Sequence, residues 1–347
     1  MNAFTTADIT AAARRQEVSM FLQSRKVADP RLISAKLRST SKFGDLLPQV
    51  TDPTKNALRA RLVSVLNEKG EVLPSSDSAL GRLWKLVNSD RSSLDACEEV
   101  ILLDPMLTAR IFRVSNSAAY RANASSVADA LRFIGFKVLR ELAFNAGVFN
   151  QFSQLGNSTE WEVFWLRNLF VARVCERICG AFHATNGTEY LAGLVHDVGW
   201  LFLAAHATDE FAMICESPRP IAESEAQILP FTHAQIGAAI AARASMPLQA
   251  IDAVAYHHRK MLMTRSTAVE PQNNPLFLGI ILGVCDAMAD AAGLDLFDRS
   301  VATTDDVIAT DEVKWLKGYK SNLDFPAMIV EERERAEEIY RSFFLES

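Results

Sequence analysis

The apolar residues of this 347-residue chain recur at the three- and four-residue spacing of a helix face along almost its whole length. Alternating apolar and polar runs rich in Val, Ile and Thr are nearly absent, and no Asn-Gly pair is flanked by such runs. The period of the apolar pattern decides which secondary structure can bury it, because side chains repeat at about 3.6 residues in helices and about two in strands. We therefore predict an all-α fold.

Start and stop signals divide the chain into helical segments. A capping residue followed by an acid or Gln three positions later, or directly by proline, predicts helix starts at Ser92, Asp104, Ser126 and Thr232. Gly135 is predicted to end the helix that begins near Ser126, and Pro247 to begin one that carries His257 and His258. Apolar periodicity predicts further helices over residues 161–182, 189–206, 276–292 and 331–344.

The charge is unevenly distributed. The formal net charge is −6, which argues against a chain whose whole surface binds nucleic acid. Residues 1–70 nevertheless hold twelve Lys/Arg and six Asp/Glu, a charge of +6, so residues 71–347 carry −12. A basic segment before an acidic body could dock on that body or reach for a partner, and charge alone does not choose between these alternatives.

Targeting signals and cysteine usage favour a cytoplasmic protein without a membrane segment. The first 30 residues hold no apolar signal region, and the longest apolar run, residues 276–285, is half of the roughly 20 residues that a spanning helix needs. The five cysteines are odd in number and lie mostly in apolar stretches, which predicts buried free thiols. Cys175 and Cys179 lack a second Cys/His pair at zinc-ribbon spacing, so no cysteine-based zinc site is expected.

His196 and Asp197 lie side by side in an apolar stretch that ends at Gly199-Trp200. Adjacent helical side chains point about 100° apart, so both groups can lean toward one ion at a helix flank. Imidazole and carboxylate together suit a divalent cation that activates water. The alternative is structural, with His196 hydrogen-bonded in a core and Asp197 paired with an arginine. Gly199 would allow another helix to approach closely.

Further histidines and one isolated carboxylate extend this set. His233 is expected just inside a helix start, and His257-His258 at a helix end, where each could equally serve as a capping or core residue. Asp286 lies among apolar neighbours, where a lone carboxylate is costly unless it is paired or binds a metal. We expect Asp286 to have a partner, and the histidines are the obvious candidates.

The order of these motifs resembles the HDOD (HD-related output domain) family, a degenerate relative of the HD metal-dependent phosphohydrolases. The stretch from Leu103 to Ser117 resembles the family pattern LDPxLTxRxLRxxNS, with Phe112 in place of a leucine, and residues 130–142 resemble AxxxLGxxxLRxL. Leu73-Pro74, the His196-Asp197 pair, His233, Met246-Pro247 and His257-His258 follow in the family's order. The resemblance spans about residues 70–290.

The resemblance implies a two-lobed helical bundle with an HD-like C-terminal lobe. We expect an HDOD domain over residues 71–295, with lobes at 71–155 and 156–295. A basic helical extension would occupy residues 1–70, and a helical tail residues 296–347.

Two departures bear on the expected mechanism. The place of the first metal-ligating His in HD phosphohydrolases holds Arg167 and Asn168, and a guanidinium cannot bind a cation. The Gly-Tyr-Pro motif of cyclic di-GMP hydrolases is absent after His257-His258. The resemblance therefore implies a bacterial-type signal-transduction output or scaffold module, without hydrolase activity, that binds a protein partner or a small ligand or nucleotide in the HD-like cleft.

The alternative is a metal-dependent HD-type phosphohydrolase that acts on a phosphoester or nucleotide. The expected cofactor is none or one divalent metal ion. Its candidate or vestigial ligands are His196, Asp197, His233, His257, His258 and Asp286, and no catalytic residue is assigned.

A basic cluster between residues 110 and 140 raises a separate hypothesis. It holds Arg110, Arg113, Arg121, Arg132, Lys137 and Arg140 around a predicted helix junction at Gly135. Nucleic-acid binding is one interpretation, and a solvated basic face or pairing with acidic residues is the other. DNA is not expected as a partner, and an acidic protein is favoured over it.

Overall fold

The computed structural model describes residues 50–69, 79–87, 92–116, 124–152, 159–184, 188–243, 246–258, 277–297 and 302–344, together with residues 47, 89 and 120. Every regular element within these residues is a helix, which confirms the all-α prediction. The helices are α3 (Pro53–Lys69), α4 (Ala79–Val87), α5 (Leu94–Leu102), α6 (Pro105–Asn116), α7 (Val127–Phe152), α8 (Thr159–Ala181), α9 (Thr188–Val195), α10 (Val198–His206), α11 (Thr208–Glu216), α12 (Ile221–Ile228), α13 (His233–Arg243), α14 (Leu248–Tyr256), α15 (Phe277–Ala291), α16 (Thr304–Ile308), α17 (Asp311–Tyr319) and α18 (Phe325–Phe344).

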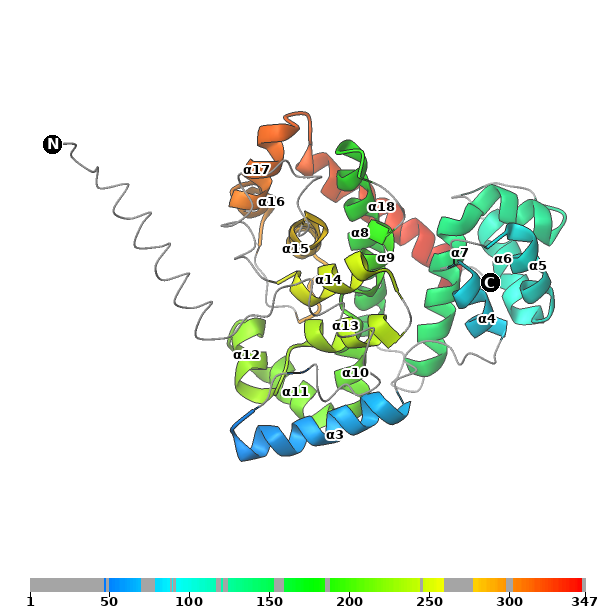
Figure 1. Cartoon of the computed structure of the whole chain (residues 1–347). Coiled ribbons are helices and arrows are strands. Elements are labelled where there is room, and N and C mark those ends of the chain that lie inside the picture. The colour runs from blue at the N-terminus through cyan, green and yellow to red at the C-terminus, as the bar shows by residue number, and fades with distance from the viewer. Residues whose placement is uncertain are drawn as a thin grey trace.

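The helices form two lobes that lie side by side (Figure 1). The first lobe consists of α4–α7, and its core contains the fully buried Leu83, Ile101, Ile111 and Leu131. Gly135 interrupts α7 with φ 67° and ψ 177°, a conformation that favours glycine, so two helical segments meet there as predicted. The predicted boundary between the lobes falls in residues 153–158, outside the described residues.

The second lobe is built around α8, which packs against α9, α15 and α18. A second layer places α13 between α10 and α14. Phe170, Phe202 and Tyr256 are among the largest fully buried side chains and fill the space between these helices. No helix in the described residues combines the length and apolar character needed to cross a membrane.

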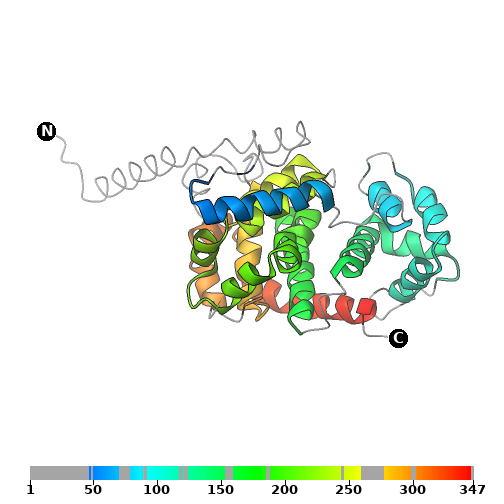
Figure 2. The same ribbon diagram turned by 90° about the horizontal axis from the view of Figure 1, so that it is seen from below.

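The tail helix α18 runs from the second lobe toward the first (Figures 1 and 2) and contacts both α8 and α6. Buried Glu332 accepts hydrogen bonds from Arg173 Nε at 2.8 Å and from Arg177 Nη1 at 3.0 Å, both of α8. Arg333 Nη1 donates to the carbonyl oxygen of Ala292, just after α15. The tail is therefore anchored at two sides of the second lobe.

Helix α3 lies along the second lobe beside α11 and α12 (Figure 1). Arg61 Nη2 donates to both carboxylate oxygens of Glu210 in α11, at 2.8 and 2.9 Å, and Lys55 Nζ donates to the carbonyl of Ala226 in α12 at 2.6 Å. This part of the basic extension is docked on the bundle. Arg14, Arg15, Arg25 and Lys26 lie outside the described residues.

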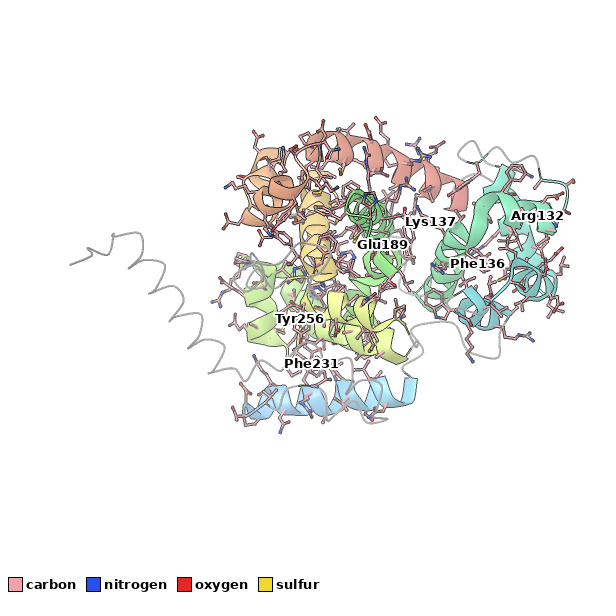
Figure 3. All side chains as sticks on the ribbon, turned by 45° about the horizontal axis from the view of Figure 1, so that its top comes forward. Arg132, Phe136, Lys137, Glu189, Phe231 and Tyr256 are labelled. Atoms are coloured by element: carbon pink, nitrogen blue, oxygen red, sulfur yellow. The ribbon has the colours of Figure 1, made fainter. Side chains whose placement is uncertain are left out.

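The described side chains of the basic cluster between residues 110 and 140 do not all lie on one surface. Lys137 pairs with Glu176 of α8 and lies 4.7 Å from the centre of the Tyr190 ring in α9, so it joins the two lobes. Arg140 Nε donates to the carbonyl of Val87 at 2.7 Å. Figure 3 shows Lys137 facing the second lobe and Arg132 on the far side of the first. At least two of the six cations are therefore engaged within the protein.

Two glycines bring the helices that carry the histidines into close contact. A Cβ on Gly199 would lie 2.0 Å from the carbonyl oxygen of His233, and one on Gly283 would lie 2.4 Å from that of His257. Both neighbours are backbone atoms, so a side chain at either position would force the helices apart. The predicted close approach at Gly199 is confirmed.

Two predicted helices differ from the structure. The helix predicted over residues 189–206 is wrong, because α9 ends at Val195 and α10 begins at Val198. Asp197 leaves helical geometry, with φ −98° and ψ 8°, where His233 packs against the start of α10. Helix α18 begins at Phe325 and not at residue 331, because Asp324 Oδ1 accepts from the amide of Ala327 and caps an earlier start.

Most of the predicted helix starts are confirmed by their hydrogen bonds. Asp104 Oδ1 accepts from the amide of Leu107, Ser126 Oγ from that of Asp129, and Thr232 forms a reciprocal capping box with Gln235. The start predicted at Ser92 lies one residue later, because Ser93 caps α5 through the amide of Ala96. Cys97, Cys175, Cys179 and Cys285 are buried free thiols, as predicted, whereas Cys215 is exposed.

Candidate functional site

His196 and Asp197 lie in the break between α9 and α10, where both side chains are buried. His196 Nδ1 lies 2.8 Å from the carbonyl oxygen of Gly193. A carbonyl can only accept, so Nδ1 carries the proton. His196 Nε2 then faces Asp197 Oδ2 at 3.1 Å and Asp286 Oδ1 of α15 at 3.2 Å. The break, and not the 100° offset within one helix, directs both side chains into the same cleft.

His233 is the first residue of α13, and three contacts fix its ring. Glu225 Oε1 accepts from the His233 backbone amide at 2.6 Å and from Nδ1 at 2.8 Å. The ring of Trp200 stacks on it with centroids 4.2 Å apart. His233 Nε2 therefore points into the cleft, where it lies 3.4 Å from Asp197 Oδ1.

His257 and His258 follow the C-terminus of α14 and differ in their surroundings. His257 Nδ1 donates to the carbonyl of Val254 at 2.7 Å. Its Nε2 is buried without a hydrogen-bond partner, 3.8 Å from Asp197 Oδ1. The side chain of His258 is 43% exposed, and its Nε2 lies 3.0 Å from His233 Nε2. Its Nδ1 is 3.6 Å from Asp286 Oδ2.

All six predicted site residues thus meet in one cleft of the second lobe. They form two overlapping groups with ligand-type atoms close enough to hold an ion. One group is Asp197, His233, His257 and His258, and the other is His196, Asp197 and Asp286. The Nδ1 atoms of His196, His233 and His257 each face a fixed oxygen, so that each Nε2 points into the cleft, an arrangement typical of imidazoles that bind metals.

Arg167 of α8 occupies the same cleft, where its side chain is buried. Its Nε lies 3.2 Å from Asp197 Oδ2, its Nη2 2.5 Å from Asp286 Oδ1, and its Nη1 2.7 Å from Asp290 Oδ1. Nη1 also donates to the carbonyl of Leu294 at 2.8 Å. Neighbouring Asn168 instead turns away and donates to the carbonyl of Phe164 at 2.7 Å. The guanidinium therefore bridges three carboxylates from two segments of the chain.

Adjacent carboxylates raise the pKa values of His196 and His233. Burial opposes a charge on each ring, but Asp197 outweighs it at His196 and raises the pKa of that imidazole to about 9. Glu225 and Asp197 likewise raise the pKa of His233 to about 10. His257 behaves differently, because burial and the neighbouring His258 and His196 lower its pKa well below the ordinary value. His257 is thus a neutral hydrogen-bond acceptor at Nε2.

The carboxylates around Arg167 also differ in the direction of their pKa shifts. Burial opposes their ionisation, but Arg167 lowers the pKa of Asp286, and His196 with Arg167 lowers the pKa of Asp197. Asp290 is less well compensated, and burial raises its pKa to about 6 in spite of Arg167. Asp197 and Asp286 are therefore ionised at neutral pH.

The donor set fits one metal ion and does not fit two. Arg167 already engages Asp197 Oδ2 and Asp286 Oδ1, the carboxylate oxygens that the His196 group would offer to a cation. Asp197 Oδ1 and the Nε2 atoms of His233 and His257 stay free of the guanidinium. Imidazole-rich sets with one carboxylate suit zinc-like ions better than magnesium.

A cavity of about 480 Å³ opens from these residues. Its buried end holds His233, His257 and Arg167, and its more exposed end is formed by residues after α15 and by α16 and α17. Asp306 and Glu312 of the tail line it, together with Asp295 and Phe297. The tail is thus part of the cleft.

Sequence reasoning missed two acids that contact the predicted site residues, Glu225 and Asp290. Glu225, which orients His233, lies in a polar helix with no distinguishing neighbour. Asp290 lies four residues after Asp286, on the same face of α15, and this spacing could have revealed it. The expected partner of Asp286 is found, but Arg167 contacts it more closely than His196 does.

The HDOD domain family matches residues 73–260, which is more than half of the chain. No curated protein matches it. Solved structures with the same fold include an HDOD domain protein of unknown function from Geobacter sulfurreducens, with a TM-score of 0.59 and 23% identity over 81% of this chain and 99% of that one.

Two further structures extend the comparison. A protein described as a "Putative phosphohydrolase" from Shewanella amazonensis SB2B has a TM-score of 0.60 and 19% identity, covering 82% of this chain and 98% of its own. A "Putative signal transduction protein" from Marinobacter aquaeolei VT8 has a TM-score of 0.55 and 19% identity, covering 90% and 66%. At these identities the likeness concerns the fold alone. The family match and the shared helical architecture together assign this chain to the HDOD domain family.

Proposed function

We propose that this chain is a signal-transduction output module that binds a protein partner or a small ligand and does not hydrolyse phosphoesters. The observation that carries the proposal is the guanidinium of Arg167 in the cleft, bonded to Asp197, Asp286 and Asp290. It stands where the related hydrolases are expected to supply their first metal ligand.

The charge of Arg167 is permanent and cannot be removed by a metal ion that competes for the same oxygens. Displacing it would leave a buried guanidinium without its three carboxylates, which is costly in a site this enclosed. A cleft of this kind keeps the shape of a binding site, while the carboxylates of Asp197, Asp286 and Asp290 are already paired with Arg167. This favours recognition over hydrolysis.

The test is hydrolysis by the full chain, purified without a histidine tag and supplied with Mg²⁺, Mn²⁺ or Zn²⁺. Bis-p-nitrophenyl phosphate and cyclic dinucleotides serve as substrates. We expect no turnover above the metal-only background. Turnover that disappears in both His196→Ala and Asp286→Ala would overturn the proposal.

A second candidate function is metal-dependent phosphoester hydrolysis, and the unpartnered Nε2 of His257 beside Asp197 Oδ1 favours it. Asp197, His233 and His257 would hold one ion, and His258 would contact a phosphate or donate a proton. The ion would supply Lewis acidity and an activated water. Metal analysis of the untagged protein decides between the candidates, since a stoichiometric metal lost in His257→Ala is expected only for the second.

A further inference from the structure

The cavity that opens from the cleft is strongly acidic. Arg167 is the only Lys or Arg among its described lining residues, and the His233 imidazole, whose pKa is raised to about 10, adds a second cation, against six carboxylates. These acids are Asp197, Asp286, Asp290, Asp295, Asp306 and Glu312. Such a lining repels phosphates and other anions and attracts cations.

The six acids differ in how well they are compensated. Arg167 contacts Asp197, Asp286 and Asp290 at the buried end. At the more exposed end, Asp306 accepts hydrogen bonds from the backbone and hydroxyl of Thr303, and neither Asp306 nor Glu312 forms an ion pair with any described residue. Negative charge therefore remains at the more exposed end for an incoming cation.

A second observation at the buried end also points to a ligand with hydrogen-bond donors. His257 lines the cavity with a fully buried side chain, and its Nε2 has no hydrogen-bond partner. Because Nδ1 donates to Val254, Nε2 is an acceptor, and it lies 3.8 Å from a second acceptor, Asp197 Oδ1. A group with several N–H donors would satisfy both.

The walls between the two ends are apolar. They include Trp200, Ile280, Val284, Leu296, Phe297 and Val307. A lone metal ion would leave this length of wall and most of the 480 Å³ in contact with water alone. An alkyl chain would cover the wall and gain from its burial.

We propose that this cavity binds an alkyl diamine. One ammonium group donates to Asp197 Oδ1 and His257 Nε2, the methylene chain lies along the apolar walls, and the second ammonium group meets Asp306 and Glu312. The inference rests on the proposed function and names the ligand class of that same cleft. It also assigns the tail a role, because Asp306 and Glu312 both follow the segment that matches the family.

Isothermal titration calorimetry of the full-length, metal-free protein tests the proposal. The probes are the α,ω-diamines from 1,3-diaminopropane to 1,8-diaminooctane, with the monoamine and the dicarboxylate of equal length as controls. We expect one diamine length to bind about tenfold more tightly than its monoamine, with an affinity that falls as salt increases. Dicarboxylates should not bind. A monoamine that binds as tightly as its diamine, or a dicarboxylate that binds better, would overturn the inference.

A pair of neighbouring variants locates the more exposed end. Glu312→Gln removes a lining charge, whereas Asp311→Asn removes an exposed charge from the same first turn of α17. We expect Glu312→Gln to weaken diamine binding about three- to tenfold and Asp311→Asn to leave it unchanged. Equal effects of the two variants contradict the assignment. Phosphoester turnover is measured separately, so failure of diamine binding does not bear on the absence of hydrolysis.

Discussion

The two carboxylate oxygens of Asp197 face different partners: Oδ2 lies 3.2 Å from Arg167 Nε, while Oδ1 lies 3.4 Å from His233 Nε2. One side of the carboxylate is thus neutralised by a fixed cation, and the other side is open to the histidines and the cavity. Under the proposed function, this division lets the chain keep an HD-like set of side chains while Arg167 balances part of their charge.

Removal of Arg167 should destabilise the fold. The Arg167→Ala variant leaves Asp286 buried without its main counter-charge and Asp197 without one of its two, which costs about 3 to 5 kcal/mol. Urea unfolding measures the loss. The control is Arg61→Ala, because Arg61 is half exposed and pairs with Glu210 at the surface, so its removal should cost less than about 1 kcal/mol. Equal costs for the two variants would show that Arg167 is not the principal counter-charge.

Asp290 should give the wild-type protein a distinctive pH dependence. Its folded pKa of about 6 lies above the unfolded value of about 3.9. The folded state therefore holds the proton more tightly, and this stabilisation is complete below pH 3.9 and lost as the pH rises through 6. Relative to Asp290→Asn, the free energy of unfolding of the wild type should fall by about 2 kcal/mol from pH 4 to pH 7. A difference that stays constant with pH would contradict the assignment.

Gly199→Ala should disrupt the packing that positions His233. The added methyl would lie 2.0 Å from the His233 carbonyl oxygen, a backbone atom that cannot yield without moving α13. We expect a loss of several kcal/mol, about the size of a severe overpacking effect. Gly318→Ala is the matched control, since nothing lies within 4 Å of its Cβ position in α17 and helix propensity should stabilise it by up to about 1 kcal/mol. Thermal melting of both variants is the measurement.

Glu332 should hold the tail to the second lobe. It is buried and accepts hydrogen bonds from Arg173 and Arg177, so Glu332→Ala should lower the free energy of unfolding by about 2 kcal/mol. Neighbouring Glu331 is 57% exposed and contacts only Arg177 in an ion pair within the described residues. Glu331→Ala should cost less than about 1 kcal/mol. If urea unfolding finds the two losses alike, the buried pair is not what anchors α18.

The sequence predicts the helical architecture well because the relevant information is local. Capping by Asp104, Ser126 and Thr232 and the turn at Gly135 depend on a few adjacent residues. The convergence of the histidines was predicted from the order of motifs along the chain. Their hydrogen-bond partners were not, because Glu225 is distinguished only by its tertiary contact with His233.

The break between α9 and α10 at His196-Asp197 could not be predicted from the apolar periodicity. The apolar stripe continues from Leu191 to Phe202, so periodicity alone predicts one helix. The break occurs where α13 packs against Gly199, a contact between segments more than 30 residues apart. The positions of Asp306 and Glu312 at the cavity could not be predicted either, because both residues have the pattern of ordinary polar residues in a solvated tail.

The short turn after α15 is held from two directions: Arg167 donates to the carbonyl of Leu294 from within the cleft, and Arg333 donates to that of Ala292 from α18. Neither hydrogen bond can open by local fraying of a single helix end. The cleft and the tail should therefore belong to one cooperative unfolding unit, with backbone amides around residues 288–294 among the slowest to exchange with solvent. Truncating α18 should then increase exchange in the interior of the cleft as well as at the chain terminus.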